Sequence, residues 1–376
     1  MRKMVRKAVG VMLSVTMATA LITGCGSSSS SDASSSSSSD SDGLTTVNFV
    51  TPTAEASLDL AWLYAADGMG YFEDEGIKIN LIESTDGSDP KILASGQADF
   101  GGFSPSVGMS AVDTGATNIK AITNVVSQNH FGIAYNKNSG IKDWSDLEGE
   151  NIGFLSDTGS VIYNPILDAA GVDSSLVNYV NYGNAEYEAL DSGQVNAMGT
   201  WLSEYYMCEG MDYDWGYLSG DDVLPQIANS LWVNTDYAEK NPEIAKSFVK
   251  AVVKGMYFTY LNPEAVADIV LTKYPTIEIT WDGAVGSVKG NLAAMLGMTE
   301  EDQAAVVDGK TIGQFDFDKV QQTMQNLYDG GATSQLYKAE DYYTNEYVDS
   351  DVDYDAIAAD SEAYEFTSAV YTEANS

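Results

Sequence analysis

One short phrase occurs twice in this chain. Residues 92–104 are ILASGQADFGGFS, and residues 189–201 are ALDSGQVNAMGTW. Each copy is typical of a helix end, a glycine stop, a very short strand and a loop that carries an aromatic side chain. The same succession in two places indicates two α/β units of one kind, and each unit ends in a loop that suits small-molecule binding.

Strands and helices alternate around both copies of the phrase. Alternation at this spacing predicts βαβ units and largely parallel sheets. In the first unit we expect strands at 45–52, 76–83, 98–103 and 119–126, and helices at 57–72, 89–96 and 105–116. In the second we expect strands at 130–136, 150–156, 177–183 and 195–201, and helices at 160–171 and 185–193. Further helices are expected at 241–261, 262–274 and 315–331.

The N-terminus is expected to be an export signal rather than part of the fold. Residues 1–24 join a cationic start to an apolar stretch that is too short for a confident membrane span. The sequence Ile22-Thr23-Gly24-Cys25 resembles the lipobox of bacterial lipoproteins, in which the cysteine sulfur carries a diacylglycerol. The alternative is an ordinary signal peptide with an incidental cysteine. Residues 25–43 are serine-rich and polar, which predicts a disordered tether. We therefore expect a lipid anchor at Cys25 on the extracytoplasmic face of a bacterial membrane.

Charge excludes several classes of partner. The formal charge is −37, and removal of the four basic residues of 1–24 leaves −41. A surface of this charge repels nucleic acid and anionic lipid. Both arginines of the chain lie in the leader, so every basic residue beyond it is a lysine or the single histidine, His130. Cys208 is the one further cysteine, which we expect to be a packed apolar side chain without a disulfide.

Several stretches, taken in order, resemble a family of solute-binding proteins of bacterial ABC importers. The family holds sulfonate, taurine and nitrate binders together with relatives of the thiamine-pyrimidine synthase. The stretches are YAADGMGYFEDEGIKINLI, LASGQADFGGFSPS, WSDLEGENIGFLSDTGS, LDSGQVNAMGTW and NPEIAKSFVKAVVKGMYFTYLNPEAVADIV. Together and in this order, these stretches are specific for the family, but they say little about which ligand is bound.

The resemblance implies a type II periplasmic-binding-protein fold of the α/β class. Two lobes would be joined by crossover strands near 126–133 and 226–234, with a ligand cleft between them. We assign 44–130 and 232–340 to lobe 1, 131–231 to lobe 2, and 341–376 to an acidic, tyrosine-rich C-terminal extension. The implied partners are an ABC permease and its ATPase, and the protein itself is expected to be a monomer without a cofactor.

The same resemblance and local patterns give a set of candidate ligand-binding residues. Family members commonly carry an aromatic residue at Trp201 that faces the cleft, although a core tryptophan is the alternative. Free N–H groups at the helix start near Ser160 favour anions or polar acceptors. Asp59 is at least a helix cap, and His130 is either structural or at the cleft border. The full set is Asp59, Trp62, Phe103, Ser104, His130, Asp157, Thr158, Ser160, Tyr163, Trp201 and Glu204.

The types of side chain that are present beyond the leader indicate the chemistry of the expected ligand. Sulfonates are usually held by arginine, and the chain beyond the leader has none. Aromatic rings and carboxylates are plentiful, and they suit flat heterocycles with amino groups. We therefore expect a neutral or cationic heteroaromatic, such as a thiamine-precursor pyrimidine, with a taurine, alkanesulfonate or nitrate type of anion as the alternative.

Two further alternatives concern catalysis and calcium. A pyrimidine-synthase-like enzyme is disfavoured, because the resemblance implies lysine-bound pyridoxal phosphate and histidine chemistry in the cytosol, whereas this chain has one histidine and an export signal. The tail places Asp349, Asp351, Asp353 and Asp355 at alternate positions, but Tyr354 stands where an EF-hand loop needs glycine. We therefore expect a solvated or frayed acidic segment there, with weak calcium binding as the minor alternative.

Overall fold

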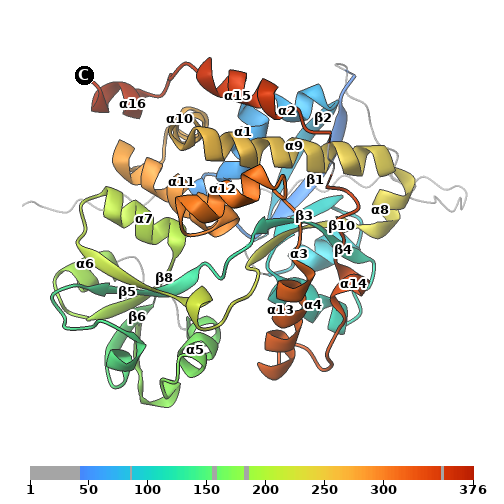
Figure 1. Ribbon diagram of the computed structural model, residues 1–376. Helices are drawn as coiled ribbons and strands as arrows, with labels where there is room; N and C mark the ends of the chain where they lie inside the picture. The colour runs from blue at the N-terminus through green and yellow to red at the C-terminus, as the bar shows by residue number, and fades with distance from the viewer. Residues whose placement is uncertain (1–42, 85–86, 155–158, 182–185, 349–350) are drawn as a thin grey trace, which may run out of the picture. The chain divides into compact units, whose positions relative to one another are not determined.

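The computed structural model describes residues 43–84, 87–154, 159–181, 186–348 and 351–376. The described chain contains two five-stranded sheets, which share no strand pairing (Figure 1). In each sheet, four strands run in one direction and one strand runs against them. In each sheet, the antiparallel strand is the first strand that the chain forms after crossing over from the other sheet. The two crossovers therefore explain why neither sheet is entirely parallel.

The first sheet has the order β2-β1-β3-β10-β4. Phe49 of β1 pairs with Phe100 of β3, and Val233 of β10 pairs with the same residue from the other side. The sheet is therefore continuous through β3, the strand that belongs to the first copy of the repeated phrase. Its strands are β1 (Thr45–Thr51), β2 (Ile77–Glu83), β3 (Phe100–Phe103), β4 (Ile119–Val126) and β10 (Asn229–Asn234).

The second sheet has the order β7-β6-β8-β5-β9, and it repeats the first in kind. The strand of the second phrase, β8, lies next to the antiparallel strand just as β3 does. The two copies of the phrase thus occupy matching places in two similar sheets. The strands are β5 (Phe131–Asn136), β6 (Asn151–Phe154), β7 (Asn178–Asn181), β8 (Ala197–Trp201) and β9 (Trp215–Ser219).

Helices pack on both sheets. The first sheet buries Phe49 and Phe100 against Phe248 of α9, and the rings of Phe100 and Phe248 stack with their centroids 4.1 Å apart. In the N-terminal half the α-helices are α1 (Ala61–Gly68), α2 (Tyr71–Asp74), α3 (Asp89–Ala94), α4 (Pro105–Asp113), α5 (Gly159–Ala169), α6 (Glu186–Asp191) and α7 (Leu202–Gly210). After the second sheet follow α8 (Thr235–Lys240), α9 (Pro242–Leu261), α10 (Pro263–Lys273), α11 (Trp281–Leu296), α12 (Glu300–Asp308) and α13 (Phe317–Asp329), then α14 (Ala339–Tyr342), α15 (Tyr354–Glu362) and α16 (Ala369–Ala374).

The helix expected at 57–72 is interrupted. A 3₁₀ turn, η1 (Leu58–Leu60), precedes α1, and Gly70 separates α1 from α2 at a φ of 76°. This positive φ is accessible to glycine without the Cβ clash that other residues meet. Further along the chain, α9 and α10 begin with proline at their first position, as the two Asn-Pro pairs predicted.

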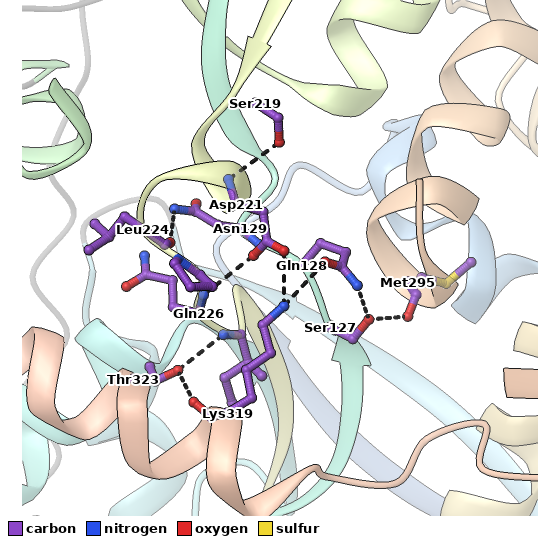
Figure 2. Close-up of polar contacts among 12 residues, drawn as sticks. Ser127, Gln128, Asn129, Ser219, Asp221, Leu224, Gln226, Met295, Lys319 and Thr323 are labelled. Atoms are coloured by element: carbon purple, nitrogen blue, oxygen red, sulfur yellow. Dashed lines mark hydrogen bonds and ion pairs between the residues drawn. The ribbon is translucent and has the colours of Figure 1, made fainter. Parts of the chain in front are cut away.

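Two chain segments cross between the sheets, at 127–130 and 220–228. The second begins earlier than the predicted 226–234, because residues from Asn229 onward already pair with β3 and β4. Asp221 joins the two segments by accepting hydrogen bonds from the backbone N–H groups of Asn129, at 2.7 Å, and Gln226, at 3.4 Å. Lys319 of α13 lies 3.1 Å from Asp221 and donates to the Gln128 side chain at 3.2 Å (Figure 2). One lysine therefore holds both crossovers against one helix.

Helices α7 and α11 pack very closely, as Figure 1 also shows. A Cβ atom at Gly286 would lie 2.2 Å from the Tyr206 carbonyl oxygen, and one at Gly290 would lie 2.5 Å from that of Leu202. The absence of side chains at these glycines lets the two backbones approach directly. Because α7 follows β8 of the second sheet and α11 contacts β4 of the first, this contact joins the two units at a third place.

The C-terminal extension is docked on the helices. Tyr343 is buried and forms a bridge with Ala121 of β4, and Ile357 of α15 is buried against the first hydrophobic core. Asp268 of α10 accepts hydrogen bonds from the backbone of Ser368 at 2.8 Å and from the Tyr364 hydroxyl at 2.7 Å. In the acidic run itself, Asp351, Asp353 and Asp355 are exposed, in agreement with the solvated face expected there, while Val352 between them is buried.

The acidic run of the tail does not assemble a metal site in the described residues. Asp353 caps α15 by accepting from the N–H of Ala356 at 3.1 Å, and Asp349 lies outside the described residues. No group of three or more metal-ligating side chains is found in the ranges given above. Within the same ranges, no helix has the length and apolar character needed to cross a membrane.

Candidate binding pocket

A pocket of about 480 Å³ lies where the first sheet ends and the crossovers begin. Residues that follow the carboxyl ends of β1, β2 and β3 line it, which is the usual position of ligands in open α/β sheets. The second unit contributes Phe131, Ile162 and Trp201. The volume of the pocket falls in the range of small-molecule sites, and most of the pocket wall is apolar.

Asp59 and the turn that carries it are held at the pocket wall by hydrogen bonds. It lies in η1, and its own backbone N–H donates to the Ser57 hydroxyl at 3.1 Å. The Asn291 amide of α11 donates to the Leu58 carbonyl at 3.0 Å and so holds the same turn. The carboxylate accepts from the Ser203 hydroxyl at 2.7 Å. Burial raises the pKa of Asp59, and the neighbouring donor groups of Ser203, Trp201 and Ser57 oppose that rise.

Two tryptophans contribute aromatic rings to the pocket. Trp62 begins α1 and packs edge-on against Phe49, with ring centroids 6.3 Å apart. Trp201 is the last residue of β8 and the N-cap of α7. The sequence Gly-Thr-Trp therefore ends a strand and starts a helix without a loop, which places the indole beside the carboxylate of Asp59.

His130 lies in the first crossover and lines the pocket. Its carbonyl accepts from the Leu202 N–H and from the Tyr217 hydroxyl, each at 2.9 Å, so the backbone is held from the second unit. Its ring packs edge-on against Phe131. Burial lowers the pKa of His130 to about 4, so the imidazole is neutral at pH 7. In the described part of the chain, no hydrogen bond is made by the imidazole nitrogens, which leaves them available to a ligand.

Glu204 and Tyr163 are buried behind the pocket rather than in its wall. Glu204 accepts from the hydroxyls of Tyr187 and Thr200, and burial raises its pKa, with a contribution from the charge of Asp59. Tyr163 donates to the Thr200 carbonyl at 3.1 Å, and its ring packs on Phe154 with centroids 5.0 Å apart. Both residues thus support the backbone that carries Trp201.

The remaining candidates fall in three positions. Phe103 reaches the pocket, but its side chain is fully buried and stacked on Trp232. Ser104 lines the pocket and caps α4, where it accepts from Val107 at 3.4 Å. Ser160 is half-buried in α5 and is not part of the pocket wall. Asp157, Thr158 and the predicted lipidation residue Cys25 lie outside the described residues.

Several residues that line the pocket were not among the predicted ligand-binding residues. Asp89 begins the helix that follows β2, so the rule about carboxyl strand ends would have located it. Asn291 and Thr323 come from α11 and α13, far along the chain, and only the tertiary fold brings them to the site. The lining residues not predicted include Asp89, Val107, Phe131, Ile162, Gln226, Asn229, Asn291, Thr323 and Leu327.

Comparison with solved structures defines the class of fold. The periplasmic aliphatic sulphonate binding protein SsuA from Escherichia coli is similar with a TM-score of 0.58 and 17% identity, over 79% of this chain and 91% of that chain. The two sheets, two crossovers and pocket described above therefore constitute a two-lobed periplasmic-binding-protein fold. At this identity, the likeness concerns the fold alone.

Comparison of sequences identifies the family. The family model described as NMT1/THI5 like matches residues 57–266, which is more than half of the chain. The chain belongs to the NMT1/THI5-like family. The residues matched run from the cap of η1 into α10, so they include both copies of the repeated phrase.

Two curated relatives differ in the activities their names state. A 4-amino-5-hydroxymethyl-2-methylpyrimidine phosphate synthase from Aspergillus parasiticus is 25% identical over 218 residues, 54% of this chain and 64% of that protein. A formylaminopyrimidine-binding protein from Halalkalibacterium halodurans is 24% identical over 221 residues, 56% of this chain and 66% of that protein. The match spans just under two thirds of the length of each relative.

Proposed function

We propose that this protein is an extracytoplasmic solute-binding lipoprotein that delivers a small molecule to an ABC importer. The preferred ligand is a neutral or cationic heteroaromatic, such as a thiamine-precursor pyrimidine. The leader, the expected lipid at Cys25 and the serine-rich tether support a position outside the cell membrane. A relative named as a formylaminopyrimidine-binding protein supports both the class and the ligand.

The observation that carries the proposal is the composition of the pocket. Two indole rings, those of Trp62 and Trp201, stand in a pocket that also holds the carboxylates of Asp59 and Asp89. Aromatic faces suit a flat ring, and carboxylates accept hydrogen bonds from its amino groups. Neutral His130 adds a group that either donates or accepts.

The principal alternative is an anion of the sulfonate, taurine or nitrate type. The fold relative from Escherichia coli is titled a sulphonate binding protein. Among the described lining residues, however, none is a lysine or arginine, whereas sulfonate binding ordinarily uses such a cation. The pocket composition therefore favours the heteroaromatic.

An enzyme is the alternative of another class, since the Aspergillus parasiticus relative is named a synthase. A lysine would have to reach the pocket for lysine-bound cofactor chemistry, and the described wall contains none. An expected export signal also separates the chain from a cytosolic pathway. Both points favour binding over catalysis.

A thermal-shift screen of the purified protein tests the function. The panel contains aminopyrimidines, thiamine, riboflavin, taurine, alkanesulfonates and nitrate. We expect a rise in Tm with an aminopyrimidine, because a ligand that binds only the folded state stabilises it. Trp201→Ala should abolish the rise, and Trp144→Ala, which changes a half-buried tryptophan outside the pocket, should retain it. A response to sulfonates alone would favour the anion alternative, and no response to the panel would contradict the proposed ligand class.

A further inference from the structure

The pocket has an unbalanced charge. Its described wall carries two carboxylates, Asp59 and Asp89, and no lysine. The one basic ring, that of His130, is neutral at pH 7 because burial lowers its pKa to about 4. Electrostatic interactions are stronger in such partly apolar surroundings than in water, so the sign of the ligand's charge matters there.

Asp59 is the carboxylate whose surroundings are fully defined. Its side chain accepts a hydrogen bond from Ser203, and the Trp201 indole lies near enough to lower its pKa; both are uncharged groups. None of the ion pairs formed by the described residues includes Asp59. Neutral donors orient the carboxylate without cancelling its charge, and a buried charge without an opposite charge is costly. A cation placed beside Asp59 would remove that cost.

A second acid lies behind Asp59. The carboxyl group of Glu204 is engaged by Thr200 and Tyr187, and burial together with the charge of Asp59 raises its pKa. A raised pKa favours the uncharged acid, so Glu204, which does not line the pocket, does not replace Asp59 as the partner of a cation. The wall therefore offers one oriented carboxylate next to an indole face.

We propose that the pocket selects the cationic member of the heteroaromatic class and that Asp59 is the counter-ion of the ligand's protonated amino group. This assignment rests on the proposed solute-binding function and narrows its ligand to a flat ring with a positively charged substituent. The ring packs against Trp62 or Trp201, and the ammonium group donates to the Asp59 carboxylate.

A matched pair of probes isolates the charge. A 4-aminopyrimidine with a 5-aminomethyl group is cationic at pH 7, and the same ring with a 5-hydroxymethyl group is neutral and nearly equal in size. Isothermal titration calorimetry of the full protein should give at least about tenfold tighter binding of the amine, which corresponds to about 1.4 kcal/mol. In Asp59→Asn that preference should fall to within about threefold, because the amide retains the shape and loses the charge.

The control is Asp99→Asn, which neutralises another carboxyl group whose pKa is raised by burial but which lies outside the pocket wall. It should retain the tenfold preference. Asp89→Asn separates the two lining acids: retention of the preference in that variant supports Asp59, and its loss there with retention in Asp59→Asn overturns the assignment.

The wild-type protein alone gives a second test that does not depend on the folding of a variant. Adding the 5-carboxymethyl analogue, an anion, should yield the affinity order cation, neutral, anion. Equal binding of all three would overturn the cation inference and leave the proposed heteroaromatic function intact. If none of the three rings binds, the proposed ligand class itself fails, and this outcome is distinct from the loss of charge selectivity.

Discussion

The carboxylate of Asp59 and the hydroxyl of Ser203 are 2.7 Å apart, although 144 residues separate them in the chain. Asp59 belongs to the turn before α1, and Ser203 to the first turn of α7, after the strand of the second phrase. A single hydrogen bond therefore joins the segment that follows β1 to the segment that follows β8. This bond lies at the wall of the pocket, so it links the two units where a ligand is expected.

Replacing Ser203 with alanine should raise the pKa of Asp59 further. The hydroxyl stabilises the charged carboxylate, and its loss leaves burial less opposed. A carbon-13 NMR titration of the aspartate carboxyl groups measures the change directly. We also expect a loss of roughly 1–2 kcal/mol in the free energy of unfolding above pH 7, because a hydrogen bond to a charged group is removed. Ser192→Ala, in an exposed helix end, is the control, and an unchanged Asp59 titration in Ser203→Ala would contradict the assignment of this bond.

Replacing Lys319 with methionine should destabilise the protein by about 1–2 kcal/mol. The value lies between those of exposed and buried ion pairs, because both side chains are only partly exposed, at 21% for Lys319 and 17% for Asp221. Urea unfolding of Lys319→Met, Asp221→Asn and the double variant forms a thermodynamic cycle. We expect a positive coupling between the two positions. Lys137→Met, which breaks an exposed pair with Asp214, should have little effect; strict additivity of the Lys319 and Asp221 variants would mean that the pair contributes nothing to the crossovers.

Replacing Gly286 with alanine should cost roughly 1–3 kcal/mol, since the added methyl group would overlap the Tyr206 carbonyl. The nearest atom is backbone, so relief requires a shift of α7 against α11. Differential scanning calorimetry should show a lower Tm than for Gly330→Ala, where the new Cβ lies 3.1 Å from its nearest neighbour. Equal Tm values for the two variants would show that the close helix contact is absent in solution.

The stability of the protein should depend on His130 between about pH 6.5 and pH 4. Burial holds the pKa of this histidine at about 4, whereas it is near 6.5 when exposed. Between these two pH values the unfolded state binds a proton on the histidine and the folded state does not, so the free energy of unfolding falls as pH falls. The stability that the neutral histidine contributes is fully present above about pH 6.5 and is lost as the pH falls toward 4. It amounts to roughly 2–3 kcal/mol.

Urea unfolding of the wild type and of His130→Asn at a series of pH values measures this contribution. Carboxyl groups also titrate in the window, but they are common to both proteins, so the difference between the curves belongs to the single histidine. Parallel curves from pH 8 to pH 4 would contradict the neutral, buried state of His130.

The alternation of strands and helices was predicted well where local signals are strong. The strands β1, β2 and β4 coincide closely with the runs identified from β-branched and aromatic residues, and the Asn-Pro starts located α9 and α10. The two-lobed fold is confirmed, as is the placement of both phrases at strand ends.

The missed elements have physical explanations. Helix α11 contains Gly283, Gly286 and Gly290, and glycine lowers helix propensity by up to about 1 kcal/mol per residue. Packing against α7 compensates, and that partner is visible only in three dimensions. Helix α7 itself starts without a breaker, because Trp201 ends the strand and caps the helix without a side-chain hydrogen bond.

The pocket was predicted in part for the same reason. Six residues were predicted from local patterns together with the family resemblance, and the structure places all of them in the pocket lining, although their binding of a ligand stays a prediction: Asp59, Trp62, Phe103, Ser104, His130 and Trp201. Thr323 and Leu327 come from a helix whose amphipathic pattern indicates only that it is buried on one side. No local pattern states which sheet such a helix will cover.

The glycine contact between α7 and α11 also ties Trp201 to the first unit. The chain order assigns this residue to the second unit, but it caps a helix whose backbone lies directly on α11, beside η1 and β4 of the first unit. Its indole lies near enough to Asp59 of the first unit to lower the pKa of that carboxyl group. Trp201 is thus held by both units, since its strand also pairs with Phe131 of the second sheet. A ring that enters finds both indoles already ordered, so the entropy lost on binding is confined to the ligand and to whatever part of the second sheet follows it.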